Sequence, residues 1–318
     1  MPKVSVLVPT YKPNQQHITE TLESLRAQSE TDWECIICDE PTDVDTHELI
    51  MDYMVDARFQ YFRNEKCLGI GGNWNRCFSK SSGDIIACLF QDDLWEPDYL
   101  EAALKILSEN QSVGMVSMNH RYQYDEDLWT KDGYELVQSV KKDLTDGKHE
   151  GKEILEWWLK KNMHPNIIGE PPFVVLRREL MEKVGPFNEK MPQFLDVEYW
   201  LRCLVNTDWY FETKSHGAFR VHGEAASAKN NESGTGLYDR LTCFEQLISN
   251  LKGDLRRTAI KSRNRSVQDM IEKFFNRVKH GKSTTSKGGG QVIKFVVRHP
   301  ILVGISTLKA WKNGLNKR

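Results

Sequence analysis

The first 120 residues alternate short apolar runs with segments of helical periodicity. The apolar runs occupy residues 4–9, 33–39, 58–62, 84–90 and 113–118. Between them, hydrophobic residues recur every three or four positions, as at Ile18, Leu22 and Leu25. Such runs are typical of strands buried on both faces, and their alternation with helices favours a mainly parallel sheet flanked by helices. The sequence therefore predicts an α/β fold whose ligands bind at the carboxyl ends of the strands.

The remaining residues are predicted to complete the sheet and then to form helices. Residues 119–165 are polar and weakly periodic, and we expect them to cross over the sheet. Further strands are predicted at 173–176, 208–212 and 217–221. An amphipathic helix is predicted by the helical spacing of Val197, Trp200, Leu201 and Leu204. Beyond about residue 235 the spacing predicts helices with a flexible Gly-rich linker at 283–290. The predicted domains are therefore 1–120, 121–235 and 236–318.

Charge is distributed unevenly along the chain. Residues 252–318 carry 17 Lys and Arg against 3 Asp and Glu, whereas residues 1–251 carry 26 against 42. A basic C-terminal segment on an acidic body either meets an anionic partner or forms a solvated extension. The mean hydropathy is −0.56 and no apolar run approaches 18 residues, so no membrane-spanning helix is expected. The first residues lack the pattern of a secretion signal.

The seven cysteines do not suggest a disulfide framework. Cys35 and Cys38 form a C-x-x-C pattern inside an apolar run, which favours packed strand residues over a redox pair at a helix N-terminus. No second C-x-x-C or His pair follows at zinc-binding spacing. We therefore expect a cytoplasmic protein.

Polar and aromatic side chains end three of the predicted strands. They are Pro9, Thr10 and Tyr11 after the first, Asp39 after the second, and Gln91, Asp92 and Asp93 after the fourth. In a parallel sheet these ends share one edge, where the carboxylates would repel unless a cation neutralised them. Oxygen ligands favour Mg²⁺ or Mn²⁺, which commonly shares its remaining positions with phosphates. The alternative is that Asp92 and Asp93 form an acidic turn capping the helix that begins near Pro97.

Seven segments extend this pattern over residues 3–230. They are VSVLVPTYKP, IICDEPTD, NEKCLGIGGNWNRC, LFQDDLWEPDYL, GEPPFVVLRRELMEKVGPFNE, FLDVEYWLR and FRVHGEAAS. In this order they resemble the motifs of inverting family-2 glycosyltransferases with the GT-A fold, of the bacterial polysaccharide and lipid-linked glycan type. The resemblance implies that residues 1–120 bind a nucleotide sugar, that 121–235 bind the acceptor, and that 236–318 form a helical basic extension.

The resemblance assigns a set of donor-binding residues. They are Pro9, Thr10, Tyr11, Asp39, Asn73, Asn75, Gln91, Asp92 and Arg220. In it Asp39 would hydrogen-bond the nucleotide base and Tyr11 would stack on it. Asn73 and Asn75 follow a predicted Gly69–Gly72 loop, and they would meet donor sugar or base or simply belong to a tight turn.

The resemblance also implies a divalent cation, Mn²⁺ or Mg²⁺, held by Asp92, Asp93 and His222. The family often has an Asp two positions before Asp92, where this chain has Phe90. Neutral imidazole can ligate a metal, although a single His is also compatible with packing. Gly169, Glu170 and Pro171 would shape the floor beneath the sugar, or form an ordinary loop before a strand.

Asp196 stands at the aspartate of the family's E-D motif and would act as the general base. The preceding Glu of that motif is Leu195 here. Asp196 also fits a helix N-cap, and the two roles are compatible because a helix N-terminus keeps a carboxylate ionised.

The implied activity is metal-dependent transfer of a hexosyl or N-acetylhexosaminyl group, with inversion, from a nucleoside diphosphate donor, with UDP favoured. The acceptor would be a saccharide hydroxyl, lipid-linked, in cell-surface polysaccharide biosynthesis. The alternative is a non-catalytic nucleotide-sugar-binding or membrane-scaffold protein of the same fold. A sugar nucleotidyltransferase would need a Gly-rich basic loop after the first strand, and an oxidoreductase a G-x-G-x-x-G; the chain has neither.

The C-terminal tail suggests a location for this activity. Its apolar residues are Phe295, Val296, Val297, Ile301, Leu302, Ile305, Leu308 and Trp311, and cations separate them. The segment would lie on an anionic membrane surface, at the inner face of the cytoplasmic membrane, or pack as a helix on the body. The acidic body argues against nucleic acid as a partner.

Overall fold

The computed structural model describes residues 2–124, 131–223, 236–279 and 295–315. They divide into two compact units. The first comprises Met1–Ile154, Pro165–Lys190 and Leu195–His222, and the second comprises Leu155–His164, Met191–Phe194 and Gly223–Arg318.

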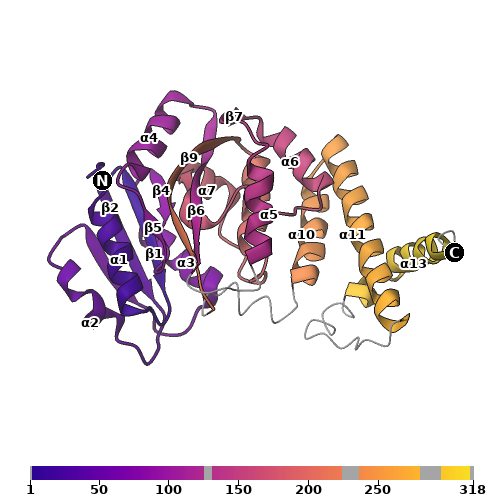
Figure 1. Ribbon diagram of the computed structural model, residues 1–318, viewed down its shortest axis with the longest axis horizontal. Helices are drawn as coiled ribbons and strands as arrows, with labels where there is room; N and C mark the ends of the chain where they lie inside the picture. The colour runs from indigo at the N-terminus through magenta and orange to yellow at the C-terminus, as the bar shows by residue number, and fades with distance from the viewer. Residues whose placement is uncertain (1, 125–130, 224–235, 280–294, 316–318) are drawn as a thin grey trace. The chain divides into compact units, whose positions relative to one another are not determined.

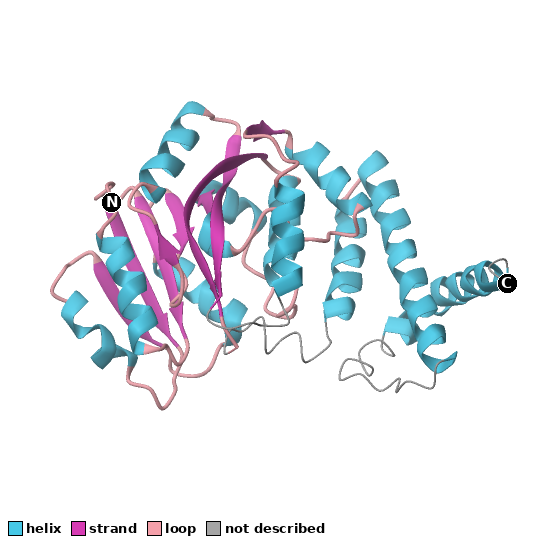
Figure 2. Ribbon diagram, in the orientation of Figure 1, coloured by secondary structure: helices cyan, strands magenta, loops and turns pink. Residues whose placement is uncertain are grey.

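A nine-stranded sheet forms the centre of the first unit (Figures 1 and 2). Its order is β3 (Phe59–Arg63), β2 (Trp33–Asp39), β1 (Val4–Thr10), β4 (Ile85–Cys88), β8 (Val174–Arg177), β6 (Val113–Tyr124), β9 (Asp208–Val221) and β5 (Leu94–Trp95), with β7 (Gly147–His149) paired to β9. The first four strands are parallel, as the sequence predicts. Beyond them the sheet is mixed, because β8 runs antiparallel to both β4 and β6.

Helices flank this sheet on both sides (Figure 2). They are α1 (Gln15–Arg26), α2 (Thr46–Ile50) with a 3₁₀ turn at Met51–Tyr53, α3 (Gly69–Lys80), α4 (Tyr99–Glu109), α5 (Lys131–Lys141), α6 (Gly151–Lys160), α7 (Arg178–Val184) and α8 (Leu195–Leu204), with a second 3₁₀ turn at Pro171–Phe173. The apolar faces of α1 and α4 share a core with Val4, Val6 and Val8, which alternate along β1 and so point to one side of the sheet. The α/β prediction is confirmed.

Three predicted local structures are wrong. The strands expected at 208–212 and 217–221 are one strand, β9, because the backbone stays extended through the exposed residues Thr213, Lys214 and Ser215 and the buried His216. Residues 119–124 do not cross the sheet but continue β6 along β9. The Gly69–Gly72 segment is not a loop but the first turn of α3. A Cβ at Gly72 would lie 2.9 Å from the Leu68 Cβ, so glycine permits the close packing there.

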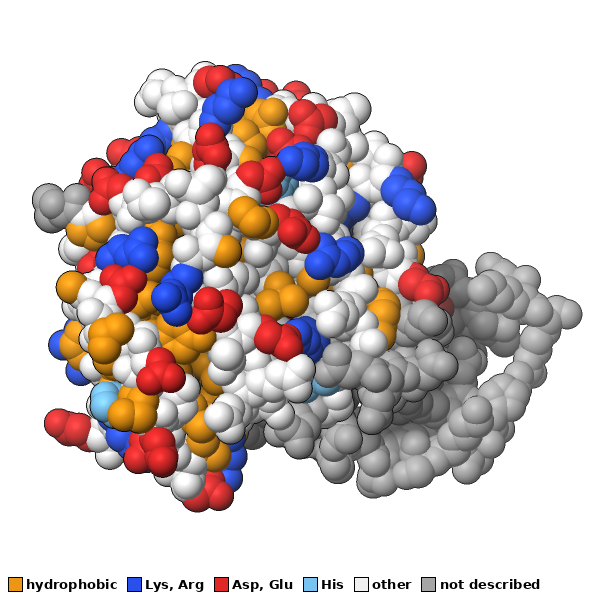
Figure 3. Space-filling view, turned by 60° about the vertical axis from the view of Figure 1, so that its left-hand side comes forward, with side chains coloured by type: hydrophobic (Ala, Val, Ile, Leu, Met, Phe, Trp, Pro, Cys, Tyr) orange, Lys and Arg blue, Asp and Glu red, His pale blue; other side chains and the backbone are white. Residues whose placement is uncertain are grey.

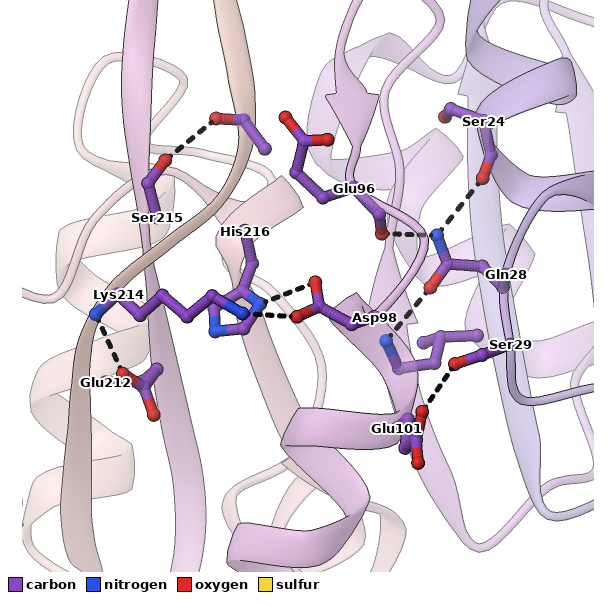
Figure 4. Close-up of polar contacts among 12 residues, drawn as sticks. Ser24, Gln28, Ser29, Glu96, Asp98, Glu101, Glu212, Lys214, Ser215 and His216 are labelled. Atoms are coloured by element: carbon purple, nitrogen blue, oxygen red, sulfur yellow. Dashed lines mark hydrogen bonds and ion pairs between the residues drawn. The ribbon is translucent and has the colours of Figure 1, made fainter.

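Polar contacts hold β9 beside the segment that follows β5 (Figure 4). Asp98 accepts hydrogen bonds from Lys214 Nζ at 2.5 Å and from His216 Nδ1 at 3.0 Å. On the other side, Gln28 donates to the carbonyl of Glu96 at 2.8 Å. These contacts connect α1, the start of α4 and the middle of β9, and thereby fix the course of β9 toward its C-terminal end.

Gly217 of β9 should be a strict requirement for this packing. A Cβ there would press against the carbonyl oxygen of Leu94 and lie 2.7 Å from a ring carbon of Phe173. We expect Gly217→Ala to lower the free energy of unfolding by about 1–3 kcal/mol, because overpacking displaces β5 from β9. The control is Gly133→Ala in α5, where a Cβ meets nothing within 4 Å. That change should leave stability equal or raise it by up to about 1 kcal/mol. Equal urea midpoints for the two variants would contradict the prediction.

The second unit contains α10 (Gly236–Asn250), α11 (Gly253–Lys279) and α13 (Pro300–Leu315), which confirms the predicted helices beyond residue 235. Leu241 and Val267 pack with Phe295 into a small core. The linker predicted at 283–290 lies outside the described residues. Among the helices that are described, none combines the length and apolar character needed to cross a bilayer.

Candidate functional site

The loops after β1 and β4 are joined by a pair of hydrogen bonds. Gln91 accepts from the backbone N–H of Tyr11 at 2.8 Å and donates to its carbonyl at 3.1 Å. The Tyr11 side chain is 52% exposed, so one aromatic face is available to a ligand. Two predicted residues separated by 80 positions therefore meet at one sheet edge, as the parallel arrangement of β1 and β4 requires.

Asp39 lies beneath this edge and is fully buried. One of its oxygens accepts hydrogen bonds from the hydroxyls of Thr10 and Thr46, both at 2.8 Å. The other accepts from the Tyr61 hydroxyl at 3.0 Å. Burial, followed by the Asp39 charge, raises the pKa of Tyr61 to about 12, so this phenol remains a donor at neutral pH. The structure thus shows Asp39 ordering Thr10 and Tyr61, and its contact with a nucleotide base stays a prediction.

The two asparagines of α3 bond to the protein itself. Asn73 is buried and donates to the carbonyls of Cys38 at 2.9 Å and Thr10 at 3.3 Å. Asn75 exchanges hydrogen bonds with the backbone of Phe187, at 3.0 and 2.8 Å. Both amides therefore fasten α3 to neighbouring segments, which favours packing over the predicted contact with a donor.

Asp92 and His222 come together although 130 residues separate them in sequence. Asp92 follows β4, His222 follows β9, and Oδ2 of the first lies 2.9 Å from Nε2 of the second. Both side chains are partly exposed. Neighbouring ligands of an octahedral Mg²⁺ or Mn²⁺ lie about 3 Å apart when each bond is about 2.1 Å. The spacing of these two atoms therefore suits a shared cation.

Asp93 has a different environment from Asp92. Its side chain is buried, and Oδ1 accepts from the backbone N–H of Arg220 at 3.0 Å. Burial, reinforced by the charge of Asp92, raises the pKa of Asp93 well above its usual range. Asp93 therefore takes up a proton more readily than an ordinary Asp, and its carboxyl ties the β4 end to β9. Because its carboxyl bonds β9 and not α4, the acidic-turn alternative is not supported.

Arg220 is buried beside these carboxyl groups. One terminal nitrogen, Nη2, donates to Glu20 of α1 at 2.6 Å. The other, Nη1, is buried and has no hydrogen-bond partner within the described part of the chain. The guanidinium thus keeps an unmet donor near Asp93, which suits the predicted contact with a phosphate oxygen.

Asp196 occupies the first turn of α8. Oδ1 accepts from the backbone N–H of Val197 at 2.7 Å, and Oδ2 accepts from Asn166 Nδ2 at 2.9 Å. Burial raises the pKa of Asp196 to about 6 against these hydrogen bonds, and the charge of Glu170 adds to the rise. A carboxylate with this pKa is ionised at neutral pH yet accepts a proton more readily than an ordinary Asp, as a general base must.

Glu170 connects the two ends of the site. It precedes the 3₁₀ turn at Pro171–Phe173, and its charge raises the pKa values of both Asp93 and Asp196. The charge of Glu170 thus acts on a strand-end carboxyl and on the carboxylate of α8. No set of three His, Cys, Asp or Glu side chains among the described residues could hold a metal by itself. A cation here would need oxygens from a ligand.

Four residues of this region were missed by sequence analysis. They are Asn166, His120, Tyr122 and Lys141, which contact or face Asp196 and Glu170. His120 and Tyr122 alternate along β6, and this period of two would have placed them on one face had 119–124 been recognised as strand. No local pattern singles out Asn166 or Lys141 as part of the site, because Asp196 is 30 positions from Asn166 and the partner of Lys141 is also distant in sequence.

The glycosyl transferase family 2 model matches residues 5–182, which is more than half of the chain. An uncharacterized glycosyltransferase of Methanocaldococcus jannaschii, MJ1057, is 27% identical over 213 residues, 66% of this chain and 67% of its own. The Escherichia coli UDP-Glc:alpha-D-GlcNAc-diphosphoundecaprenol beta-1,3-glucosyltransferase WfgD is 30% identical over 108 residues. That match covers 34% of this chain and 42% of WfgD, so it spans less than half of that relative.

Two solved structures share the fold. Staphylococcus aureus TarS 1–349 in complex with UDP-GlcNAc superposes with a TM-score of 0.64 at 16% identity, covering 96% of this chain and 79% of TarS. The mannosyltransferase PcManGT of Pyrobaculum calidifontis, in complex with GDP-Man and Mn²⁺, gives 0.57 at 15% identity, covering 99% and 87%. The chain therefore belongs to glycosyl transferase family 2, and its fold is GT-A. The resemblance seen in the sequence is confirmed.

Proposed function

We propose that the chain transfers a sugar from a nucleoside diphosphate donor, with UDP favoured, to a saccharide hydroxyl, with inversion at the anomeric carbon. The observation that carries this proposal is the pairing of Asp92 with His222 at two strand ends and of Asp196 with Asn166 at the start of α8. The names of WfgD and of the TarS complex support a uridine donor.

Asp92 and His222 would hold a divalent cation, Mn²⁺ or Mg²⁺. Their ligating atoms have the spacing of neighbouring ligands, and the lack of a third protein ligand among the residues that the structure describes fits a cation completed by diphosphate oxygens. The presence of Mn²⁺ in the PcManGT complex supports this assignment. When bound, the ion would stabilise the charge that develops on the departing diphosphate. Asp93, buried and bonded to the backbone of β9, would order the site.

Asp196 would take the proton of the acceptor hydroxyl as its oxygen attacks the anomeric carbon. The bond from that carbon to the diphosphate oxygen breaks in the same step, and the nucleoside diphosphate leaves with the bonding electrons. Asn166 and the Val197 N–H hold the Asp196 carboxylate in place, which keeps one orientation toward the acceptor. Arg220, through its unmet donor, would bind the diphosphate.

The activity can be tested with a panel of nucleotide sugars, Mn²⁺ and a lipid-linked saccharide acceptor. Release of nucleoside diphosphate that depends on the acceptor would support transfer. Binding of the donors without any turnover would instead favour the non-catalytic alternative. The product's anomeric configuration, measured by NMR, decides whether the reaction inverts.

The acceptor is proposed to be lipid-linked in cell-surface polysaccharide biosynthesis, in line with the name of WfgD. The C-terminal segment supports a membrane location because its apolar residues form two separate sets, one buried against the second unit and one exposed. Phe295, Leu302 and Val303 pack on the core of the second unit. Ile301, Ile305 and Leu308 lie at helical spacing and are exposed, Ile301 by 79%.

This exposed stripe of Ile301, Ile305 and Leu308 belongs to a segment without acids. Residues 294–318 contain six Lys and Arg and no Asp or Glu. An apolar stripe flanked by cations complements an anionic lipid surface. The segment can therefore pack on the second unit and contact a membrane at the same time, because different residues make the two contacts. The side chain of Trp311, also named in the sequence pattern, lies outside those described.

We expect Ile301→Asp together with Ile305→Asp to reduce flotation with phosphatidylglycerol-containing liposomes by at least about tenfold, because two buried apolar contacts are replaced by repelled charges. The control is Met51→Asp together with Val55→Asp, two exposed apolar residues of the first unit, 58% and 90% exposed. On the face drawn in Figure 3, acidic and basic side chains of the described residues are interspersed, whereas residues 294–318 contain basic residues and no acidic ones. Equal flotation of both double variants would contradict the membrane proposal.

A further inference from the structure

A buried anion lies under the turn that precedes β8. Glu170 accepts a hydrogen bond from the Tyr122 hydroxyl at 2.9 Å, and its other oxygen lies 3.1 Å from His120 Nε2. Both partners come from β6. The imidazole of His120 is stacked on Phe173, with ring centres 3.9 Å apart, and this packing fixes its direction.

Lys141, at the end of α5, supplies a cation to the same place. Its side chain is buried, and its ammonium lies 3.1 Å from the point that a Cβ on Gly169 would occupy. Burial would by itself raise the pKa of Glu170, but the close contact with His120, followed by the charge of Lys141, lowers it to about 2. Glu170 is therefore ionised throughout the range in which a protein of this kind works.

Asn166 links this turn to Asp196. Its Nδ2 donates to the carbonyl of Gly169 at 3.0 Å and to Asp196 Oδ2 at 2.9 Å. Its Oδ1 accepts from the Gly169 N–H at 3.1 Å. The indole of Trp200 in α8 donates to the same carbonyl at 3.0 Å. Two hydrogen bonds to the backbone of Gly169 thus orient the Asn166 amide, and one of its N–H groups donates to the Asp196 carboxylate.

We propose that Glu170 and Asn166 are positioning residues that set how readily Asp196 takes up a proton, Glu170 by its fixed charge and Asn166 by its hydrogen bond. The two act in opposite directions. A nearby anion disfavours the ionised form of Asp196, whereas a hydrogen bond to the carboxylate favours it. Glu170 directly follows Gly169, whose carbonyl shares the Asn166 amide with Asp196, and the Val197 N–H is a further donor to Asp196. That Asp196 is a catalytic base rests on the proposed function.

The opposite signs make a direct test possible. The full chain is labelled with ¹³C at the Asp carboxyl carbon, and the Asp196 signal is assigned by its loss in Asp196→Asn. Glu170→Gln should lower the titration midpoint of Asp196 by roughly one pH unit. Asn166→Leu should raise it by roughly half a unit or more. Glu182→Gln removes the same charge from an exposed position of α7 and should leave the midpoint unchanged.

Shifts of opposite sign would support the inference, since general loosening of the fold would move both variants in one direction. Two results would overturn the inference. One is an Asp196 midpoint in Glu170→Gln that stays within about 0.2 unit of its value in the unsubstituted protein. The other is a fall of the Asp196 midpoint in Asn166→Leu. If Glu170→Gln does not fold, the sign found for Asn166→Leu decides.

This titration needs no substrate. Opposite shifts in a chain that transfers no sugar would uphold the tuning of Asp196 and refute the proposed function alone. An active enzyme with an unmoved midpoint would refute the tuning alone. Where transfer is measured, the acidic limb of the pH profile of kcat/KM should follow the NMR midpoint in each variant.

Discussion

Asp196→Asn should reduce sugar transfer by roughly 10²–10⁴-fold, the usual contribution of a positioned general base. The amide keeps the size of the carboxylate and can still accept from the Val197 N–H, so α8 should remain intact. Donor affinity, measured by calorimetry with UDP and Mn²⁺, should change little, because the Asp92–His222 pair lies on other elements. The matched control is Asp143→Asn, an exposed carboxylate with no part in the site.

The pH dependence gives a second check on the same residue. The pKa of Asp196 is raised to about 6, so the ionised form that can accept a proton predominates above that pH. Transfer should therefore fall as pH decreases through about 6 and stay level above it. Retained transfer in Asp196→Asn, or a profile without an acidic limb near this value, would remove Asp196 from the role of base.

Asp92→Ala should weaken Mn²⁺-dependent binding of UDP by at least roughly tenfold and lower turnover by about 10²–10³-fold. The variant removes one of the two proposed protein ligands and leaves His222 without its partner at 2.9 Å. Binding of uridine, which carries no phosphate, should be unaffected and serves as the control for an intact base site. Chelation of the metal should lower UDP affinity in the unsubstituted chain and have little further effect in the variant.

His222→Ala should reproduce part of the Asp92→Ala effect if the two side chains share a cation. Unchanged calorimetric affinity for UDP with Mn²⁺ in Asp92→Ala would mean that the metal, if bound at all, is held elsewhere. Phe90, which stands where the family often has an Asp, would then account for the missing ligand at this place.

The first four parallel strands could be predicted from sequence because the cause is local. Each is a continuous apolar run, and β1 and β2 are buried almost along their full length. Polar residues interrupt β9 and the end of β6, and for this reason the sequence predicts two strands in the first case and a crossover in the second. An exposed stretch of strand has the polar composition that is typical of a loop. The glycines of α3 misled the prediction because Gly71 and Gly72 permit close packing within a helix, while Gly69 alone has the positive φ, +76°, that is typical of a turn.

Sequence order also placed Asp92 and Asp196 in the site through their motifs, but it could not supply the partners that define their chemistry. The His222 contact, the burial of Asp93 and the Asn166 bond all join residues at least 30 positions apart.

The amino-acid sequence by itself determined the parallel half of the sheet, the family, and which carboxylates stand at strand and helix ends. Those properties follow from short-range periodicity and from residue types in a fixed order. Only the tertiary structure decided which carboxyl group has a raised pKa and which has a lowered one. That property depends on burial and on charges brought from distant segments, and Glu170, Lys141 and His120 acquire their effect on the site only when β6, α5 and the turn before β8 pack together.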